Sequence, residues 1–165
     1  MRQILAATVL AVGLSAPVEA RAQWMHQGNE SAFGDSGLHI AVTASGRYGF
    51  GIRCRGDLIE MLYVTPDTSF DKSTYTMANL TKPKLRVRVD DSTIVDLEGE
   101  LVDIDGTAAL LAEIDLDLVY AVRDAKRRVA VVLQLIGENY HENSFGVRGS
   151  TAATNKMLVG CNLPR

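Results

Sequence analysis

Two cysteines, Cys54 and Cys161, constrain the fold of this 165-residue chain more than any other feature. The second cysteine ends a four-residue repeat, whose positions are Phe145, Gly149, Ala153, Met157 and Cys161. Residues four apart lie on one face of an α-helix, so the repeat predicts an amphipathic helix over residues 150–160 that carries Cys161 into the core. We expect a strand over residues 144–148 before it and Ser150 as the N-cap of the helix.

The first 22 residues have the pattern of a signal peptide. A short positive start precedes an apolar stretch over residues 4–14, and Ala20-Arg21-Ala22 supplies the small residues of a cleavage site. The apolar stretch is too short for a membrane span, which needs about 20 residues. We therefore expect export by general secretion, with residues 1–22 removed and the mature protein in the periplasm, not inserted in a membrane. Secretion from the cell is the alternative.

In an exported protein, a single pair of cysteines predicts a disulfide. Cys54 and Cys161 are far apart in the sequence, so a bridge between them would close most of the domain. Zinc held by the cysteines together with His26, His39 and His141 is the alternative, but no pair among these residues has the spacing of a zinc site. We predict a disulfide, no metal and no cofactor.

Much of the remaining chain alternates apolar and polar residues with the two-residue period of half-buried strands. Strands are predicted over residues 38–44, 47–54, 58–64, 85–89, 93–97, 100–104, 107–114 and 129–136. Asp105-Gly106 indicates a type I′ hairpin, and Asp115 precedes a second helix over residues 116–126. These patterns predict one α+β domain over residues 23–165, a mostly antiparallel sheet covered by two helices, with a β-sandwich as the alternative.

Two segments without helix or strand periodicity are candidates for contact with a partner. Residues 23–37 form a polar arm anchored by Trp24, and residues 65–84 form a long polar loop that carries Phe70 and Tyr75. Loops of about twenty residues are uncommon in compact domains and are often functional, although a plain solvated connection is the alternative. Because exposed aromatic side chains suit protein interfaces, we predict Trp24, Phe70 and Tyr75 as binding residues.

The sequence contains no recognisable catalytic pattern. No serine lies in a Gly-x-Ser-x-Gly motif, and residues 103–106 match only a fragment of a calcium loop, with Ala112 where the loop needs glutamate. Asp96, Glu98 and Glu100 have strand spacing and would share one face of a strand. A carboxylate pair acting on a glycan is one interpretation of them, and a solvated sheet face is the simpler one. We predict that the protein is not an enzyme.

The layout of the chain resembles a known group of exported proteins. The residues that carry the resemblance are Ile52-Arg53-Cys54, Arg88-Val89-Asp90 and the terminal F-x3-G-x3-A-x3-M-x3-C segment. In these features the chain resembles the periplasmic type VI secretion-associated proteins of the VasI kind and related small exported proteins of Gram-negative bacteria. The resemblance implies a periplasmic accessory or binding protein without known catalytic residues.

The net charge and the distribution of basic residues narrow the class of partner. The formal net charge is −3, and the basic residues are scattered along the chain, which argues against nucleic acid or anionic lipid as the main partner. We expect a non-enzymatic binding or accessory protein that contacts a protein or an envelope component, with association to a secretion system. The alternative is an immunity-type or hydrolase-inhibiting protein, because a small acidic protein can block a basic cleft.

Overall fold

The computed structural model describes residues 23–29 and 37–165 of the chain. The predicted signal peptide and residues 30–36 of the predicted arm lie outside this part. The strands are β1 (Met25–Asn29), β2 (Leu38–Ser45), β3 (Tyr48–Arg55), β4 (Leu58–Val64), β5 (Lys84–Val89), β6 (Val95–Glu98), β7 (Glu100–Ile104), β8 (Thr107–Glu113), β9 (Arg128–Leu135) and β10 (Glu138–Gly146). The helices are α1 (Lys72–Leu80), α2 (Leu116–Asp124) and α3 (Ser150–Gly160).

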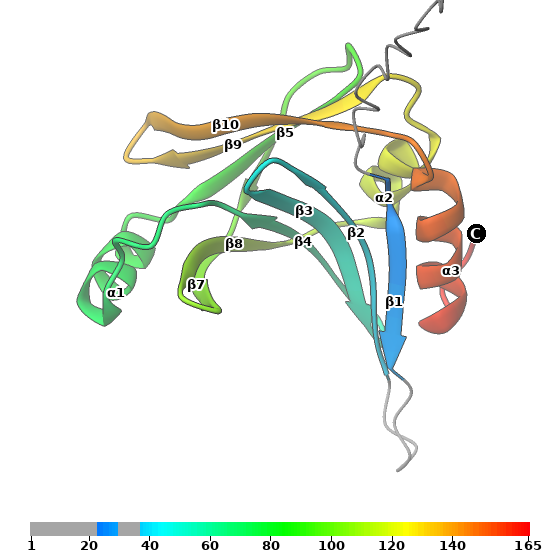
Figure 1. The fold of residues 1–165 in the computed structure, drawn as a ribbon, viewed down its shortest axis with the longest axis horizontal. Helices are drawn as coiled ribbons and strands as arrows, with labels where there is room; N and C mark the ends of the chain where they lie inside the picture. The colour runs from blue at the N-terminus through cyan, green and yellow to red at the C-terminus, as the bar shows by residue number, and fades with distance from the viewer. Residues whose placement is uncertain (1–22, 30–36) are drawn as a thin grey trace, which may run out of the picture.

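Within the described residues the strands form two antiparallel sheets (Figure 1). The larger sheet has the order β1-β2-β3-β4-β8-β7, and the smaller has the order β10-β9-β5-β6. The β7–β8 connection is the predicted hairpin, since Asp105 and Gly106 both have the positive φ angles (52° and 79°) that a type I′ turn requires. The prediction of a mostly antiparallel fold is therefore confirmed.

The core lies between the two sheets, whose inner faces meet through aromatic side chains. Phe145 of β10 stacks on Phe50 of β3 with ring centroids 5.2 Å apart and meets Tyr63 of β4 edge-on at 6.2 Å. All three rings are buried, and burial of apolar area at about 25 cal/mol per Å² is the main source of stability here. Two facing sheets are a feature of the alternative prediction, a β-sandwich. The three helices of the described residues are the feature that the α+β prediction adds.

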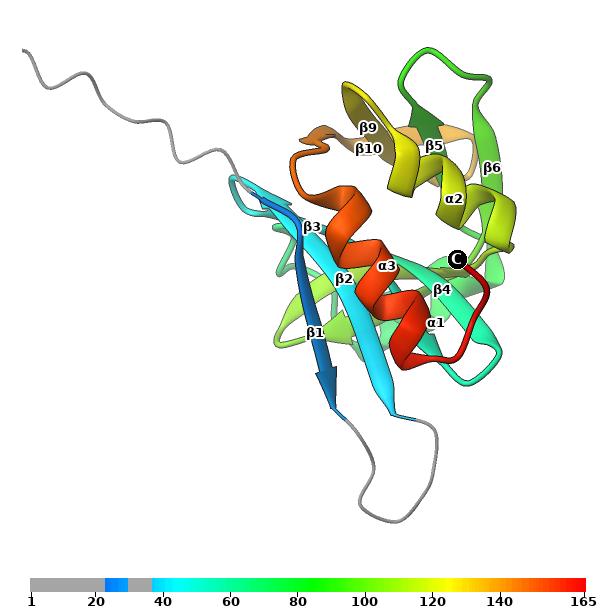
Figure 2. The ribbon, with the colours of Figure 1, turned by 90° about the vertical axis from the view of Figure 1, so that its right-hand side faces the viewer.

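Helices α2 and α3 pack on each other, and α3 also covers β1 and β2 (Figure 2). Asp115 is the N-cap of α2, as predicted, and its carboxylate accepts a hydrogen bond from the Leu118 N–H at 2.9 Å. The prediction of Ser150 as N-cap of α3 is wrong, because Gly149 takes that position with a φ of 84°. The Ser150 hydroxyl instead donates to the Arg123 carbonyl at 3.2 Å and so ties α3 to the end of α2.

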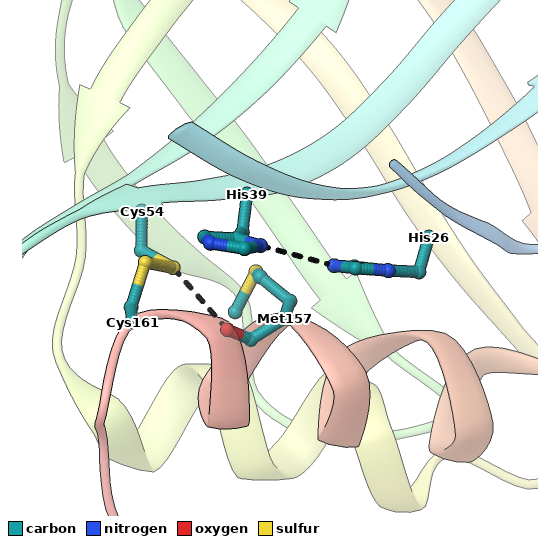
Figure 3. Close-up of a disulfide and its surroundings, with 5 residues drawn as sticks. All are labelled: His26, His39, Cys54, Met157 and Cys161. Carbon is teal, nitrogen blue, oxygen red and sulfur yellow. Dashed lines mark hydrogen bonds between the residues drawn. A yellow bond between two sulfur atoms is a disulfide. The ribbon is translucent and has the colours of Figure 1, made fainter. Parts of the chain in front are cut away.

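The predicted disulfide joins Cys54 of β3 to Cys161, the C-cap of α3 (Figure 3). Both cysteines are buried, and their Cα atoms lie 6.3 Å apart. His39 of β2 lies opposite Cys54 in the strand register, and a Cβ at Gly160 would lie only 2.2 Å from the His39 ring. Only glycine therefore allows the last turn of α3 to approach the sheet this closely.

The predicted arm is ordered where the structure describes it, because Trp24 docks in the core, and the expectation that Trp24 is exposed for binding is wrong. Trp24 is 2% exposed, its indole N–H donates to the Gly146 carbonyl at 2.8 Å, and its ring meets Phe50 edge-on. The next residues form β1, which pairs with β2 at the edge of the larger sheet. A large aromatic ring with one polar atom is most stable when buried with that atom hydrogen-bonded, and the core supplies both conditions.

The prediction of a structureless loop over residues 65–84 is also wrong, since this segment contains α1. The described part of the chain therefore has three helices and not two. Asp71 starts the helix as N-cap, but α1 buries none of its residues, so the apolar periodicity that identifies a packed helix is absent from its sequence.

The predicted acidic face of Asp96, Glu98 and Glu100 does not form. Asp96 and Glu98 lie in β6 of the smaller sheet, whereas Glu100 begins β7 of the larger sheet, because the chain passes from one sheet to the other at Gly99. Asp96 pairs with Arg86 at 2.9 Å, and Glu98 pairs with Lys82 at 3.3 Å. Asp96 and Glu98 are thus engaged in ion pairs at the surface of the smaller sheet, whereas Glu100 lies on a strand of the other sheet.

Candidate functional site

The candidate site is an apolar surface on α1 and the β9–β10 turn, and its local structure begins with the cap of α1. The Asp71 carboxylate accepts hydrogen bonds from the Thr74 N–H at 2.7 Å and from the Ser73 and Thr74 hydroxyls at 2.8 Å. These bonds, with the Thr74 backbone as the largest contributor, lower the pKa of Asp71 to about 2. The Asp71 carboxylate therefore stays ionised at all physiological pH values and stabilises the N-terminus of this short exposed helix.

A side chain of α1 anchors the helix to the edge of the larger sheet. The Asn79 amide donates to the Leu101 carbonyl at 3.0 Å and accepts from the Leu101 N–H at 2.7 Å, so it pairs with β7 as the backbone of another strand would. An unpaired sheet edge is a site of unwanted strand addition, and this amide protects the start of β7. Helix α1 is thus held in place by this polar pair and by Tyr75 and Ala78, which are partly buried against the core.

Three of the large apolar side chains near α1 are strongly exposed. Met77 and Leu80 on the helix are 65% and 75% exposed, and Ile136 in the β9–β10 turn is 80% exposed. Ile136 also has a φ of 51°, a left-handed conformation that costs a β-branched residue about 1–3 kcal/mol. Asparagine or glycine would relieve both the strain and the exposure, so the folded state gains nothing local from isoleucine at this position.

A groove of about 270 Å³ connects these residues, and its walls are almost entirely apolar. Phe70, Met77 and Ala78 line one wall, while Leu135 and Ile136 line the other. The helix and the turn come from different parts of the chain and lie at the same end of the molecule (Figure 1). We call this groove, with the exposed Leu80 beside it, the α1 surface.

The predicted residues Phe70 and Tyr75 lie together beneath this surface. Their ring centroids are 5.3 Å apart, and both rings are half-buried against the core. Burial, with smaller contributions from Asp103 and Asp67, raises the pKa of the Tyr75 phenol. The two rings support the groove, with Phe70 in its wall, whereas Trp24 lies in the core and takes no part.

The segment that leads into α1 is fixed by a carboxylate. Asp67 accepts hydrogen bonds from the Ser69 hydroxyl at 2.6 Å and the Ser69 N–H at 2.8 Å, and these bonds lower its pKa. Its second oxygen lies 3.4 Å from Nε2 of His141, at the bulge of β10. Asp67 therefore connects the start of the α1 segment to the opposite sheet.

Sequence reasoning identified the segment and two of its aromatic residues but missed Met77, Leu80 and Ile136. The signal that could have found Ile136 is its position directly before Gly137, where the turn needs positive φ at both residues and isoleucine is a poor choice. Met77 and Leu80 are three residues apart in a segment of low hydropathy, and their exposure depends on which side of α1 faces the sheet.

The described residues contain no group of three or more histidine, cysteine or acidic side chains placed to hold a metal ion. In the same residues, no helix is long and apolar enough to cross a membrane. The ring nitrogens of His26 and His39 lie 3.4 Å apart, and Figure 3 shows them facing each other. Nitrogens that face each other in this way can share one N–H···N hydrogen bond. To bind a metal ion, both nitrogens would instead have to direct their lone pairs at the same point.

Comparison with known proteins finds similarity in structure. No protein-family model matches the chain, and no curated protein matches it in sequence. A crystal structure of invasion-associated protein B from Bartonella henselae is similar, with a TM-score of 0.55 at 9% sequence identity. The similarity covers 86% of this chain and 95% of that chain, so the two proteins share a fold.

Proposed function

We propose that this protein is an exported, non-enzymatic binding module that holds a partner protein of the cell envelope through the α1 surface. The partner inserts an apolar side chain into the groove between α1 and the β9–β10 turn. The observation that carries the proposal is the exposure of Met77, Leu80 and Ile136 on two unconnected segments that border one apolar groove. Single exposed apolar residues are ordinary, but a cluster beside a groove is typical of an interaction site.

Export is supported by the disulfide and by the signal-peptide pattern of residues 1–22. Disulfides persist in oxidising compartments and are rare in the cytosol. The periplasm is the compartment we propose, with secretion as the alternative. The fold is also that of a protein named for invasion, which suits an envelope or surface role, and the association with a secretion system remains part of the proposal.

The experiment is site-specific photocrosslinking in the cell envelope. A photoreactive residue at Met77 is expected to crosslink one defined partner, and Leu80→Lys with Ile136→Asn in the same chain should reduce that product at least tenfold. Val159 is the matched control position, because it is 44% exposed on α3, away from the α1 surface. Equal crosslinking from positions 77 and 159, or a product unchanged by the two substitutions, would contradict the proposal.

A second candidate function is inhibition of an envelope hydrolase, and the acidic residues that favour it lie beside α2. Glu113 and Asp117 are exposed there, on the rim of a second groove. Small acidic surfaces can block basic clefts through electrostatic complementarity. Full hydrolase activity in the presence of saturating protein would exclude this function, and it would leave the proposal for the α1 surface untouched.

A further inference from the structure

Strand β6 leaves one edge of the smaller sheet open. Among the described residues it pairs only with β5. The Gly99 N–H bonds to the Pro83 carbonyl, and alternate residues of antiparallel strands exchange hydrogen bonds, so Val95 and Leu97 bond toward β5. The backbone N–H and C=O groups of Asp96 and Glu98 therefore point away from the sheet, as the template for another strand.

A groove lies beside this open edge and is lined by residues of β6 and α2, which lie next to each other in Figure 2. Its volume is about 690 Å³, and its apolar floor includes Val95, Leu97, Ile114 and Leu118. Val95 is 39% exposed although it faces the same side as the core residues of β5. A strand added to β6 would place every second side chain over this apolar floor. Those side chains would then be buried between the floor and α2.

Carboxylates surround the groove and the edge. Glu113, Asp115 and Asp117 line the groove. Asp96 and Glu98 project from the outer face of β6, where they pair with Arg86 and Lys82. Within the described residues the groove lining includes no basic side chain. The Asp115 carboxylate caps α2, whereas the side chains of Glu113 and Asp117 make no hydrogen bond or ion pair in the described part of the chain.

We propose that β6 and the α2 groove bind an extended segment of another protein in which apolar residues alternate with lysine or arginine. The segment adds to the smaller sheet as an outer strand, with apolar side chains on the groove floor and basic side chains beside the carboxylates. This is strand addition, in which main-chain bonds supply affinity and alternate side chains supply specificity. A second copy of this chain does not fit, because its own β6 would bring Asp96 and Glu98 against the same acidic edge.

The inference does not depend on the α1 surface. The α1 surface and the α2 groove share no lining residue, and Figure 1 shows α1 and α2 at opposite ends of the molecule, so variants in the two grooves can be tested separately. The probe is a blocked hexapeptide of alternating valine and lysine, and the matched control peptide replaces lysine with glutamate. The readouts are the dissociation constant, measured by NMR titration, and the hydrogen-exchange rates of the Asp96 and Glu98 amides.

We expect the lysine peptide to bind at least tenfold more tightly than the glutamate peptide and to slow exchange of the Asp96 and Glu98 amides. Asp96→Pro removes the outward N–H without removing a bond to β5, a change that edge strands tolerate. It should weaken binding at least tenfold relative to Asp96→Asn, which removes the same charge and keeps the N–H. Glu113→Gln with Asp117→Asn should weaken binding and reduce its dependence on salt.

A probe with N-methylated valines tests the same backbone bonds without altering the protein, so the test stands even if Asp96→Pro does not fold. Equal affinity of the lysine and glutamate peptides, or of the methylated and unmethylated probes, would overturn the inference. Binding that leaves the exchange of the Asp96 and Glu98 amides unchanged would also overturn it. Met77→Ser at the α1 surface, which adds no charge near the Lys82–Glu98 pair, should not change the affinity of the probe.

Discussion

Removing the disulfide is the perturbation whose effect the structure predicts best. Cys54 and Cys161 are 107 positions apart in the chain. A cross-link restricts the unfolded chain, and in the chain-entropy model a closed loop of this size contributes about 4.7 kcal/mol at 25 °C. Domains of ordinary size have unfolding free energies of about 5–15 kcal/mol, so this one bond supplies a large share of the stability.

The folded state should change little, because the sheet register and the contacts of α3 do not require the bond. Met157 and Leu158 on α3 are fully buried and keep the helix on the sheet. We therefore expect Cys54→Ala with Cys161→Ala to fold with native secondary structure, to lose about 4–5 kcal/mol of unfolding free energy, and to melt about 15 °C lower.

The assay is urea unfolding of the oxidised protein and of the double variant, with thermal melting as a second measurement. Treating the oxidised protein with a reductant supplies a control that involves no mutation, and reductant should not affect the double variant. A loss below about 1 kcal/mol, or a melting temperature of the oxidised protein that is indifferent to reductant, would refute the chain-entropy argument. Mass spectrometry showing two free thiols in the exported protein would refute the bond itself.

Three further predictions test the core and the contacts of α3. Trp24→Ala should cost about 3–5 kcal/mol of unfolding free energy in urea unfolding, because it empties a buried site; a cost below 1 kcal/mol would mean that the ring is not buried. Gly160→Ala should cost about 1–3 kcal/mol through contact with the His39 ring, and His39→Ala should remove most of that cost in a double-mutant cycle. Burial, then the charges of His39 and Lys156, lower the pKa of His26. The unfolded chain therefore binds this proton more readily, so stability should decline as pH falls below about 6.5, and less steeply in His26→Gln, as measured by melting between pH 7 and 5.

Local patterns were sufficient for much of the fold. Alternation located most of the strands, although β1 was predicted as part of an arm and β10 only over residues 144–148. Asp105-Gly106 located a hairpin, and Asp115 located the start of α2, because each of these signals arises from backbone geometry within a few residues. The pairing of Cys54 with Cys161 followed from their number in an exported chain. In the candidate site, the same reasoning identified Phe70 and Tyr75, since aromatic residues stand out in a polar segment.

Alternation could not decide which face of a strand is buried. In β2 the more apolar face carries Leu38, Ile40 and Val42, yet the structure buries the face with His39, Ala41 and Thr43. The reason lies in helix α3, which packs on the buried face of β2. The small side chains of Ala41 and Thr43 let the helix approach, and Gly160 of α3 leaves space for the His39 ring. Such complementarity joins segments more than a hundred residues apart and leaves no local signal.

By itself the sequence determined most of the strands, helices α2 and α3, the disulfide and the signal-peptide pattern. The physical reason is that periodicity and turn chemistry act within a few residues, and that the chain has only two cysteines to pair. Only the tertiary structure decided that Trp24 is a core residue, that the chain changes sheets at Gly99, and that α1 and Ile136 border one groove. These outcomes depend on which distant segments come into contact. The packing free energy arises from contacts between two such segments, so neither segment's own sequence reveals it.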